Sequence, residues 1–431
     1  MQIKINKKKI PQDWQIKKVK DVFDFIGTYS HSKDKMLYEI PSNNVVFNIH
    51  YGDIHTKYST YIDFSKTKIP FLKDFNEKIN KEKFLRNGDL VIADASEDYL
   101  GVCDSVELIN LENKKCISGL HTFALRDKGK NTSNGYRALL FKNPRVHNWL
   151  MRVSTYSKVY GVTKSSLEKT DLFLPPLPEQ DRIVAVLETW DKAIEKLQQK
   201  IKVKKEIKKG LMQDLLTGNK RLKGFSGEWK EYKLEDIAEF KKGSGISKNQ
   251  IVDGGGNPCL LYGEIYTKYD ELILNIQSYT NSKEGVWSEK GDVFVPASTT
   301  TNALDLATAT TIIEDKILVG GDVNIIRNKK NLYDPIFLSY YLSHTIKRKI
   351  AKYSQGVTII HLYGNHFKKE KITIPSLKEQ GAIASVIKSS TKEILLIERK
   401  LKYLQKQKKY LLNNLITGQI RTPENLLEKV K

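Results

Sequence analysis

The chain has 431 residues, of which 40% are hydrophobic, so it can bury a core in each of two or three domains and is not expected to be disordered. Lysine and arginine number 72 against 50 acidic residues, which gives a formal net charge of +22. This excess predicts attraction to a polyanion, with nucleic acid as the first candidate and an anionic membrane surface as the second. A merely lysine-rich composition is the alternative explanation of the charge.

Three further absences narrow the class of protein. Cys103, Cys116 and Cys259 form no Cys-x-x-Cys pair, so neither a zinc site nor a disulfide framework is predicted, and free thiols fit a reducing cytosol. Residues 1–10 are basic and lack the apolar stretch of a signal peptide. No run approaches the roughly 18 apolar residues of a membrane span. We therefore expect a soluble cytoplasmic protein without a membrane or metal partner.

The first globular segment, residues 12–174, mixes short β-like runs with turn signals. Residues 89–93 and 121–126 are the clearest strands, and residues 148–154 carry a helical pattern. These features predict an α+β fold with a mostly antiparallel sheet.

A long helix is predicted next, within residues 175–223. Its apolar positions alternate spacings of four and three residues, which is the seam of a left-handed coiled coil. The seam residues on which we rely are Ile183, Leu187, Trp190, Ile194, Leu197 and Ile201. Proline stands at the start of the segment, and Gly218 suits the helix C-terminus.

The second globular segment, residues 227–373, repeats the character of the first. Strands are predicted at residues 292–295 and 322–327, and a helical region at residues 335–352. Short motifs of the first segment return here, including Gly-Asp-Leu-Val at 88–91 as Gly-Asp-Val-Phe at 291–294. The chain therefore contains an internal repeat, in which the two globular segments differ from each other more than the two helices do.

The second long helix, within residues 374–420, is the strongest part of this repeat. Residues 379–418 align without a gap to residues 179–218, and fourteen of the forty positions are identical. The matching seam holds Ile383, Ile387, Ile394, Ile397, Leu401 and Leu404. We expect the two helices to pair antiparallel with a pseudo-twofold repeat; a helical hairpin inside one compact core is the alternative. The lysines in the second half of each helix predict either a solvated face or a face for phosphate or an acidic partner.

Candidate nucleic-acid contacts lie in loops at equivalent places of the two segments, at residues 93–99, 156–164, 297–302 and 353–361. Such loops offer hydroxyl, amide and aromatic groups for base edges, and lysine for phosphate. The candidates are Ser96, Glu97, Tyr99, Lys158, Tyr160, Lys164, Ser298, Thr299, Thr300, Asn302, Gln355, Thr358 and His361. Ordinary surface loops are the alternative for any one of them.

No catalytic or metal-binding residue is predicted in this chain. The only Pro-Pro, at residues 175–176, is flanked by leucines and lacks the pattern of an adenine methyltransferase. A Walker A motif, a cofactor-binding glycine loop and a Gly-x-Ser-x-Gly motif are also absent. A carboxylate nuclease site has too weak a motif to be excluded in this way.

The doubled helix segment resembles the conserved regions of type I restriction–modification specificity subunits. The resemblance rests on the Pro-Pro-Leu-Pro-Glu-Gln start at 175–180, the heptads, the lysine-rich middle and the Leu-Leu-Thr-Gly end at 215–218. The segments that begin at Trp14 and Trp229 resemble the starts of the target recognition domains of that family. The second copy departs mildly, with Ser390 in place of Trp190 in the seam and Pro-Ser-Leu-Lys at its start.

The resemblance implies a domain order and a division of labour. Target recognition domain 1 would span residues 1–174, the central helix 175–223, domain 2 residues 224–373, the distal helix 374–420 and a tail 421–431. Each domain would read one half of a bipartite asymmetric site in double-stranded DNA, and the helices would set the spacer between the halves. Two methyltransferase subunits using S-adenosylmethionine would dock on the helices, and restriction subunits using ATP and Mg would join them.

In this interpretation the chain itself binds no cofactor and is not an enzyme. One alternative is a self-sufficient DNA methyltransferase or nuclease with an unrecognised site, which modification of DNA by the purified chain would reveal. Another is a structural coiled coil or an RNA-binding adaptor, which equal affinity for all sequences or a preference for RNA would favour.

Overall fold

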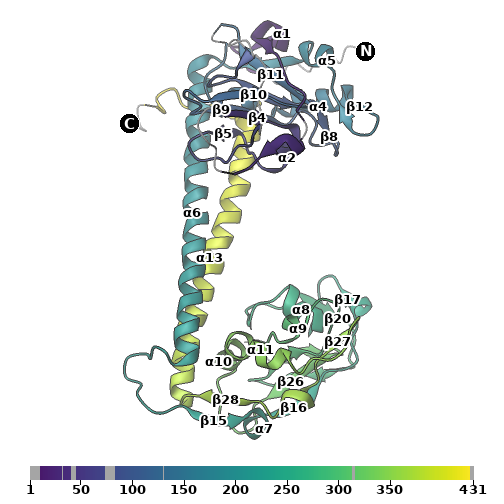
Figure 1. Cartoon of the computed structure of the whole chain (residues 1–431), viewed down its shortest axis with the longest axis vertical. Helices are drawn as coiled ribbons and strands as arrows, with labels where there is room; N and C mark the ends of the chain where they lie inside the picture. The colour runs from purple at the N-terminus through teal and green to yellow at the C-terminus, as the bar shows by residue number, and fades with distance from the viewer. Residues whose placement is uncertain are drawn as a thin grey trace. The chain divides into compact units, whose positions relative to one another are not determined.

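The computed structural model describes residues 10–31, 33–39, 45–72, 83–129, 131–312 and 316–427 (Figure 1). The chain forms two compact units. Unit 1 comprises Met1–Lys196 together with Leu401–Lys431, and unit 2 comprises Leu197–Lys400. Each unit holds one globular part and one segment from each of two long helices, and unit 1 is made of two separate stretches of sequence whereas unit 2 is continuous.

The two long helices expected from the heptad pattern are confirmed. Helix α6 spans Leu177–Thr217 and helix α13 spans Leu377–Leu415. The residue Gly218 has φ +76° and Gly418 has φ +72°, a left-handed conformation that glycine adopts without the strain of a Cβ atom. Pro178 is part of α6 and lies in its first turn. The N–H group that proline lacks would have no partner within the helix at this position, so the residue costs no hydrogen bond.

The helices pair antiparallel within each unit, as expected. In unit 1, Ile183 near the start of α6 shares a hydrophobic cluster with Leu415 at the end of α13. In unit 2, Leu215 near the end of α6 shares a cluster with Ile383 near the start of α13. Because opposite ends meet in both units, the two helices run in opposite directions (Figure 1).

The seam named from the sequence is the least exposed face of both helices. Every one of the twelve seam residues is buried or half-buried, including Trp190. Charged pairs flank the seam and join the two helices within a unit: Asp191 with Lys408 in unit 1, and Lys204 with Glu393 and Lys205 with Glu398 in unit 2. The Lys204 and Glu393 atoms are 2.8 Å apart, and this pairing fixes which turns of the helices face each other.

The globular part of unit 1 is built on a five-stranded sheet of order β2-β11-β7-β9-β5, with only the β5–β9 pair parallel. The expected strands at 89–93 and 121–126 are confirmed as β7 and β11. The elements before α6 are β1 (Gln15–Lys18), α1 (Val19–Val22), β2 (Phe23–Ile26), η2 (Lys33–Lys35), β3 (Met36–Leu37), β4 (Val46–Ile49), α2 (Tyr51–Thr56), β5 (Tyr61–Asp63), β6 (Phe71–Leu72), β7 (Leu90–Ala93), β8 (Ala95–Ser96), β9 (Ser105–Ile109), β10 (Lys115–Ser118), β11 (Thr122–Asp127), α3 (Arg137–Leu140), α4 (Pro144–Val153), β12 (Thr155–Tyr156), β13 (Tyr160–Gly161), α5 (Lys164–Glu168) and β14 (Asp171–Leu174).

Unit 2 repeats this plan with a five-stranded sheet of order β16-β26-β22-β24-β19. The expected strands at 292–295 and 322–327 are confirmed as β22 and β26. Its elements between the long helices are β15 (Lys230–Lys233), α7 (Leu234–Ile237), β16 (Glu239–Lys242), η4 (Lys248–Gln250), β17 (Ile251–Val252), β18 (Asn257–Leu260), α8 (Tyr262–Thr267), β19 (Leu272–Ile273), β20 (Ser278–Thr280), β21 (Val286–Trp287), β22 (Val293–Pro296), β23 (Ser298–Thr299), α9 (Ala303–Leu306), β24 (Thr310–Ile312), β25 (Leu318–Val319), β26 (Val323–Arg327), α10 (Pro335–Tyr340), η5 (Tyr341–Thr345), α11 (Lys347–Ala351), β27 (Ile360–His361), α12 (Gly364–Phe367) and β28 (Lys371–Ile374).

An aspartate–arginine ion pair occurs at equivalent places in the central sheets of the two units. Asp89, just before β7, binds Arg126 of β11 with an N–O distance of 2.6 Å, and Asp292, just before β22, binds Arg327 of β26 at 2.8 Å. Both aspartates are buried, where an unpaired carboxylate would be costly, so each pair ties two neighbouring strands together. The internal repeat read from the sequence is therefore present in the tertiary contacts.

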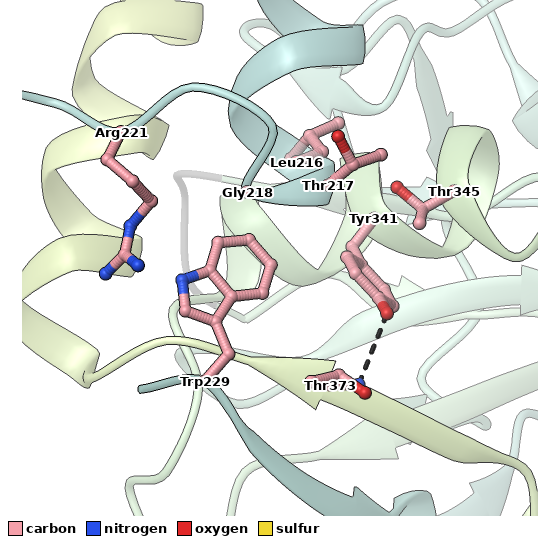
Figure 2. A pocket seen from close by; sticks show the side chains of 8 residues that line it. All are labelled: Leu216, Thr217, Gly218, Arg221, Trp229, Tyr341, Thr345 and Thr373. Atoms are coloured by element: carbon pink, nitrogen blue, oxygen red, sulfur yellow. Dashed lines mark hydrogen bonds between the residues drawn. The ribbon is translucent and has the colours of Figure 1, made fainter. Parts of the chain in front are cut away.

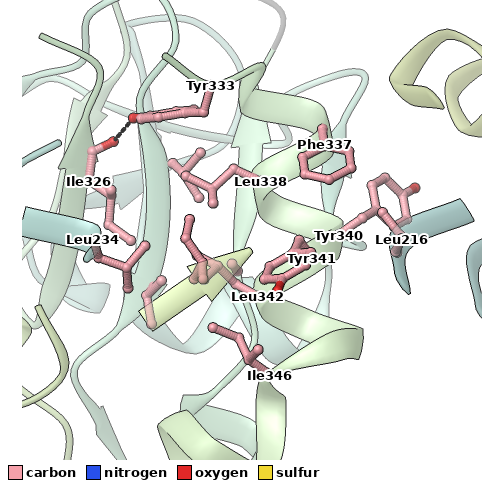
Figure 3. Packing of buried hydrophobic residues seen from close by; sticks show 14 of the residues in the cluster. Leu216, Leu234, Ile326, Tyr333, Phe337, Leu338, Tyr340, Tyr341, Leu342 and Ile346 are labelled. Atoms are coloured by element: carbon pink, nitrogen blue, oxygen red, sulfur yellow. Dashed lines mark hydrogen bonds between the residues drawn. The ribbon is translucent and has the colours of Figure 1, made fainter. Parts of the chain in front are cut away.

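In unit 2 the end of α6 is anchored in the core of the globular part. Leu216 of α6 belongs to the same cluster as Leu234, Phe337 and Leu342, and the last three are fully buried (Figure 3). Burying a side chain of this size contributes roughly 1.5–3 kcal/mol. Tyr333 also donates a hydrogen bond of 2.9 Å to the carbonyl of Ile326 in this core. The helix end and the sheet of unit 2 thus form one packed body.

Candidate nucleic-acid interface

In unit 1 a small three-stranded sheet brings two of the predicted loops together. Strand β13 pairs with β8 on one side and with β12 on the other. Its register places Tyr160 opposite Ser96 and Gly161 opposite Ala95. The loops at 93–99 and 156–164, more than fifty residues apart in sequence, therefore share one edge of the unit.

Tyrosines form the exposed surface of this small sheet. The ring centroids of Tyr99 and Tyr160 are 5.2 Å apart, and those of Tyr156 and Tyr160 are 4.8 Å apart. Tyr156 is 65% exposed. Lys158 and Lys164 beside them are exposed as well, and Lys164 Nζ lies 4.7 Å from the ring centroid of Phe25. Aromatic faces next to lysines can stack on or contact bases while the cations contact phosphate.

Unit 2 builds its counterpart from different side chains. Strand β23 pairs with β27, which places Ser298 opposite His361, and Ser298 Oγ lies 2.9 Å from His361 Nδ1. The His361 ring stacks on Tyr363 with centroids 5.5 Å apart, and Lys242 Nζ lies 5.3 Å from the centroid of Tyr363. Val357 in the adjoining loop is 96% exposed. The two units thus present the same small strand pair with different side chains.

The structure divides the thirteen candidate contact residues into two groups. Ser96, Ser298 and Thr299 have buried side chains. Asn302 is exposed, but its side-chain oxygen caps α9 by accepting hydrogen bonds from Leu304 N and Asp305 N. The candidates with exposed or half-exposed side chains not used in a cap are Glu97, Tyr99, Lys158, Tyr160, Lys164, Thr300, Gln355, Thr358 and His361.

Sequence reasoning missed the support beneath β8. His55 of α2 places Nε2 2.9 Å from the carbonyl oxygen of Ala95 and Nδ1 3.1 Å from Asp104 Oδ2. The hydrogen bond to Asp104 raises the pKa of His55, against the effect of burial. A signal existed in the sequence, because residues 51–58 and 262–269 are identical at six of eight positions. That repeat marks α2 and α8 as equivalent, with Tyr266 standing where unit 1 has His55.

A second repeated arrangement joins the long helices to the globular parts. In unit 1, Trp14 Nε1 donates a 3.1 Å hydrogen bond to Glu179 Oε2, and Arg421 Nη2 donates to the same carboxylate at 2.7 Å. In unit 2, Arg221 Nη2 donates to Glu379 Oε2 at 2.6 Å. Both glutamates are buried, so each helix start is held by an arginine that follows the end of the partner helix.

The unit 2 copy of this arrangement borders a cavity of about 380 Å³. Its lining includes Arg221, Trp229 and Tyr341, and Figure 2 shows the Trp229 ring between the end of α6 and strand β28. Trp229 Nε1 has no hydrogen-bond partner among the described residues. None of the lining residues belongs to the loops paired by β23 and β27, so the cavity is a feature of the helix junction.

Within the described ranges no group of three or more His, Cys, Asp or Glu could hold a metal ion. The three cysteines are buried and free, and burial raises the pKa of each thiol, so they are poor nucleophiles. No described helix is long and apolar enough to cross a membrane.

The fold and these surfaces together define a protein with two similar recognition modules joined by a pair of antiparallel helices. Residues 11–205 and 226–406 each match the model of the type I restriction modification DNA specificity domain, so the chain belongs to that family. The two matches cover most of the chain and coincide with the internal repeat.

Relatives and solved structures agree with this family along nearly the whole chain. The type I restriction enzyme MjaVIII specificity subunit of Methanocaldococcus jannaschii is 24% identical over 446 residues, which is 96% of this chain and 94% of that one. A relative from the same organism, named as an MjaX specificity subunit, is 27% identical over 444 residues and covers 96% and 95%. The S subunit structure from M. genitalium is 14% identical, with a TM-score of 0.54 over 96% of this chain and 98% of that one. A chain from a type I R-M system structure gives 0.56 at 16% identity, over 96% of this chain and all of that one. At these identities the two structures support the fold alone.

Proposed function

We propose that this chain is the DNA specificity subunit of a type I restriction–modification complex. The observation that carries the proposal is the duplicated strand pair, β8–β13 in unit 1 and β23–β27 in unit 2, which presents different exposed side chains in the two copies. Two unequal readers on one chain suit an asymmetric DNA site in two parts. The net charge of +22 supports binding to the phosphate backbone.

The recognition domains in this proposal are residues 1–174 and 224–373, with the helices at 175–223 and 374–420 and a tail at 421–431. Each domain reads one half-site through its loop pair, and the helices set the number of unread bases between the halves. The readers in unit 1 are the tyrosine cluster with Glu97, Lys158 and Lys164; those in unit 2 are Thr300, Gln355, Thr358 and His361. Stacking, base-edge hydrogen bonds and phosphate contacts are the interactions that these side chains can make.

The helices also offer surface to protein partners. Within unit 2, Val203, Ile207 and Leu396 are exposed although apolar, and within unit 1 Tyr403 and Tyr410 are exposed on α13. Tyr403 and Tyr410 are spaced seven residues apart, so they follow one line along the unit 1 part of α13. A stripe of this kind is typical of a protein-binding face. We assign it to two methyltransferase subunits, which carry S-adenosylmethionine and flip the target adenine.

In the complete assembly, restriction subunits with ATP and Mg supply translocation and cleavage, and this chain supplies neither cofactor nor catalytic group. The cytoplasm, where the cell's DNA lies, is the location that this role requires. The direct test is the genome-wide pattern of adenine methylation with and without the gene. Loss of a gapped, two-part motif on deletion is the expected result, and it also yields the motif.

An unchanged methylation pattern, combined with a failure of the purified chain to retain any methyltransferase in a pull-down, would contradict the proposal. The purified chain alone serves as a further control. Methylation or cleavage of DNA by the chain without partners would show a self-sufficient enzyme and would overturn the assignment of catalysis to other subunits.

A further inference from the structure

Strand β8 of unit 1 is held from two sides. On one side β13 pairs with it and places Gly161 opposite Ala95. On the other side His55 of α2 reaches the Ala95 carbonyl at 2.9 Å, with its own side chain only 17% exposed. The loop that follows β8 carries Glu97 and Tyr99, so the position of these two candidate readers depends on how firmly Ala95 is held.

Both partners of His55 can only accept hydrogen bonds. The Ala95 carbonyl faces Nε2, and the Asp104 carboxylate faces Nδ1 at 3.1 Å. A neutral imidazole has one N–H and can satisfy only one of these acceptors, whereas the imidazolium form donates to both at once. The geometry therefore requires the charged form of His55 for the full set of contacts.

The surroundings favour that charge. The hydrogen bond to Asp104 raises the pKa of His55, and Asp98 in the loop after β8 raises it further, while burial acts in the opposite direction. The Tyr51 ring, on the same helix, lies 6.2 Å from the His55 ring and 5.3 Å from that of His121. His121 itself bonds Asp94 at 3.2 Å, between β7 and β8.

We propose that His55, as an imidazolium, is a positioning residue that fixes the reading loop of unit 1, so that sequence discrimination by this unit weakens as the pH rises. The inference deepens the proposed function and rests on it. Because the folded-state pKa is raised above the ordinary value near 6.5, the double contact is complete below that value. It is lost as the pH rises through the raised pKa, which leaves either Ala95 or Asp104 without its donor.

Unit 2 provides an internal control. Its helix α8 carries Tyr266 at the position of His55, so unit 2 has no imidazole at this place. At the β23–β27 strand pair of unit 2, His361 faces the Ser298 hydroxyl, which can donate or accept a hydrogen bond. That bond can form in either protonation state, so the strand pairing that positions the loops of unit 2 is expected to depend little on pH.

The test measures discrimination separately for the two half-sites. The full chain, bound to its methyltransferase partner, is titrated with duplexes that carry one wrong base in either half-site, between about pH 6 and about pH 9. Exchange of residues 227–373 identifies which half-site belongs to unit 1. In the wild type we expect discrimination at the unit 1 half-site to fall about 10-fold with rising pH, and that at the other half-site to change less than about 2-fold.

Two variants separate charge from packing. Asp104→Asn keeps an acceptor for Nδ1 but removes the charge, so the pH midpoint of discrimination should move to lower pH. His55→Tyr copies unit 2 and should abolish the pH dependence. His344→Gln removes a histidine that pairs with Glu271 at 2.7 Å in unit 2 and should change neither half-site.

A parallel loss in both half-sites, or an Asp104→Asn midpoint equal to that of the wild type, would overturn the proposal for His55. An NMR titration of histidine-labelled full chain, with the His55 signal assigned from His55→Tyr, reads the protonation state without DNA. A His55 midpoint at or below about 6.5 would also refute the inference. Absence of sequence-specific binding at every pH would instead refute the proposed function, so the two failures are distinguishable.

Discussion

Lengthening α6 and α13 together by one heptad should lengthen the unread spacer of the DNA site by about three base pairs. Seven residues add about 10 Å of helix at ~1.5 Å per residue, and a base pair occupies ~3.4 Å along the duplex. A whole heptad keeps both seams in phase, whereas an insertion of another length would turn the seam away from its partner. The perturbation therefore changes one dimension of the molecule and leaves both reading surfaces intact.

The structure fixes where the insertions belong. Because the helices are antiparallel, the insertion between Gln198 and Gln199 of α6 must be matched by one between Arg399 and Lys400 of α13. The pairs of Lys204 with Glu393 and Lys205 with Glu398 then stay together on one side. The pair of Asp191 with Lys408 stays together on the other side. Every charged pair that joins the helices in the described residues is thereby retained.

The assay is methylation of a DNA library in which the known half-sites are separated by every spacer from shorter to longer than the natural one. The double insertion should shift the preferred spacer and leave both half-site sequences unchanged. The insertion in α6 alone is the control, because it puts the two seams out of step by a heptad and should reduce assembly. Altered half-sites at an unchanged spacer would refute the role of the helices as a spacer.

The remaining predictions concern the readers, the seam and the core. Exchanging residues 227–373 for the segment of another family member should change one half-site in the methylome; a change in both would contradict independent reading. Trp190→Asp should weaken assembly with the methyltransferase, seen by native mass spectrometry, more than it alters the sequence read, and intact assembly with changed specificity would show that Trp190 is not a seam residue. Gly418→Ala should destabilise unit 1 by about 1–3 kcal/mol in urea unfolding, because φ is +72° and a Cβ atom would lie 2.4 Å from Cγ of Pro11. Gly210→Ala, with no atom within 4 Å, is its control and should stabilise α6 by roughly 0.5–1 kcal/mol. Burial raises the pKa of Glu107 to about 7, so the stability of unit 1 should fall as the pH rises from about 4.5 to about 7, by roughly 3 kcal/mol at most, and Glu107→Gln should remove this slope.

The long helices were predictable because their signal is local and periodic. A seam residue such as Leu187 is recognised by its spacing from Ile183 and Trp190 alone, and that spacing recurs over the length of each helix. The antiparallel pairing followed from having two such helices in one chain, since neither can bury its seam alone. The left-handed glycines at the helix ends are likewise local signals.

The reading surface was predictable only in outline. Strand pairing brings the predicted loops together in each unit, but the strands that join them are two residues long, too short for an alternation of buried and exposed positions to be read. The sequence therefore did not indicate that the side chains of Ser96 and Ser298 are buried. The contact of His55 with Ala95 spans forty residues of sequence and has no periodic signature at all.

The division of the chain into units has a consequence for its synthesis. Unit 1 includes the last part of α13: Asn143 Nδ2 donates a 2.6 Å hydrogen bond to the carbonyl of Ile416, and Arg421 binds Asp13 at 2.6 Å. The earlier-made stretch of unit 1 is therefore completed by a stretch that is synthesised only after the whole of unit 2. Until then its apolar face, with Leu187 and Ile183, has no partner helix to cover it. A chain whose synthesis stops before α13 would leave this apolar face uncovered. Chaperones and proteases would then act on the incomplete product.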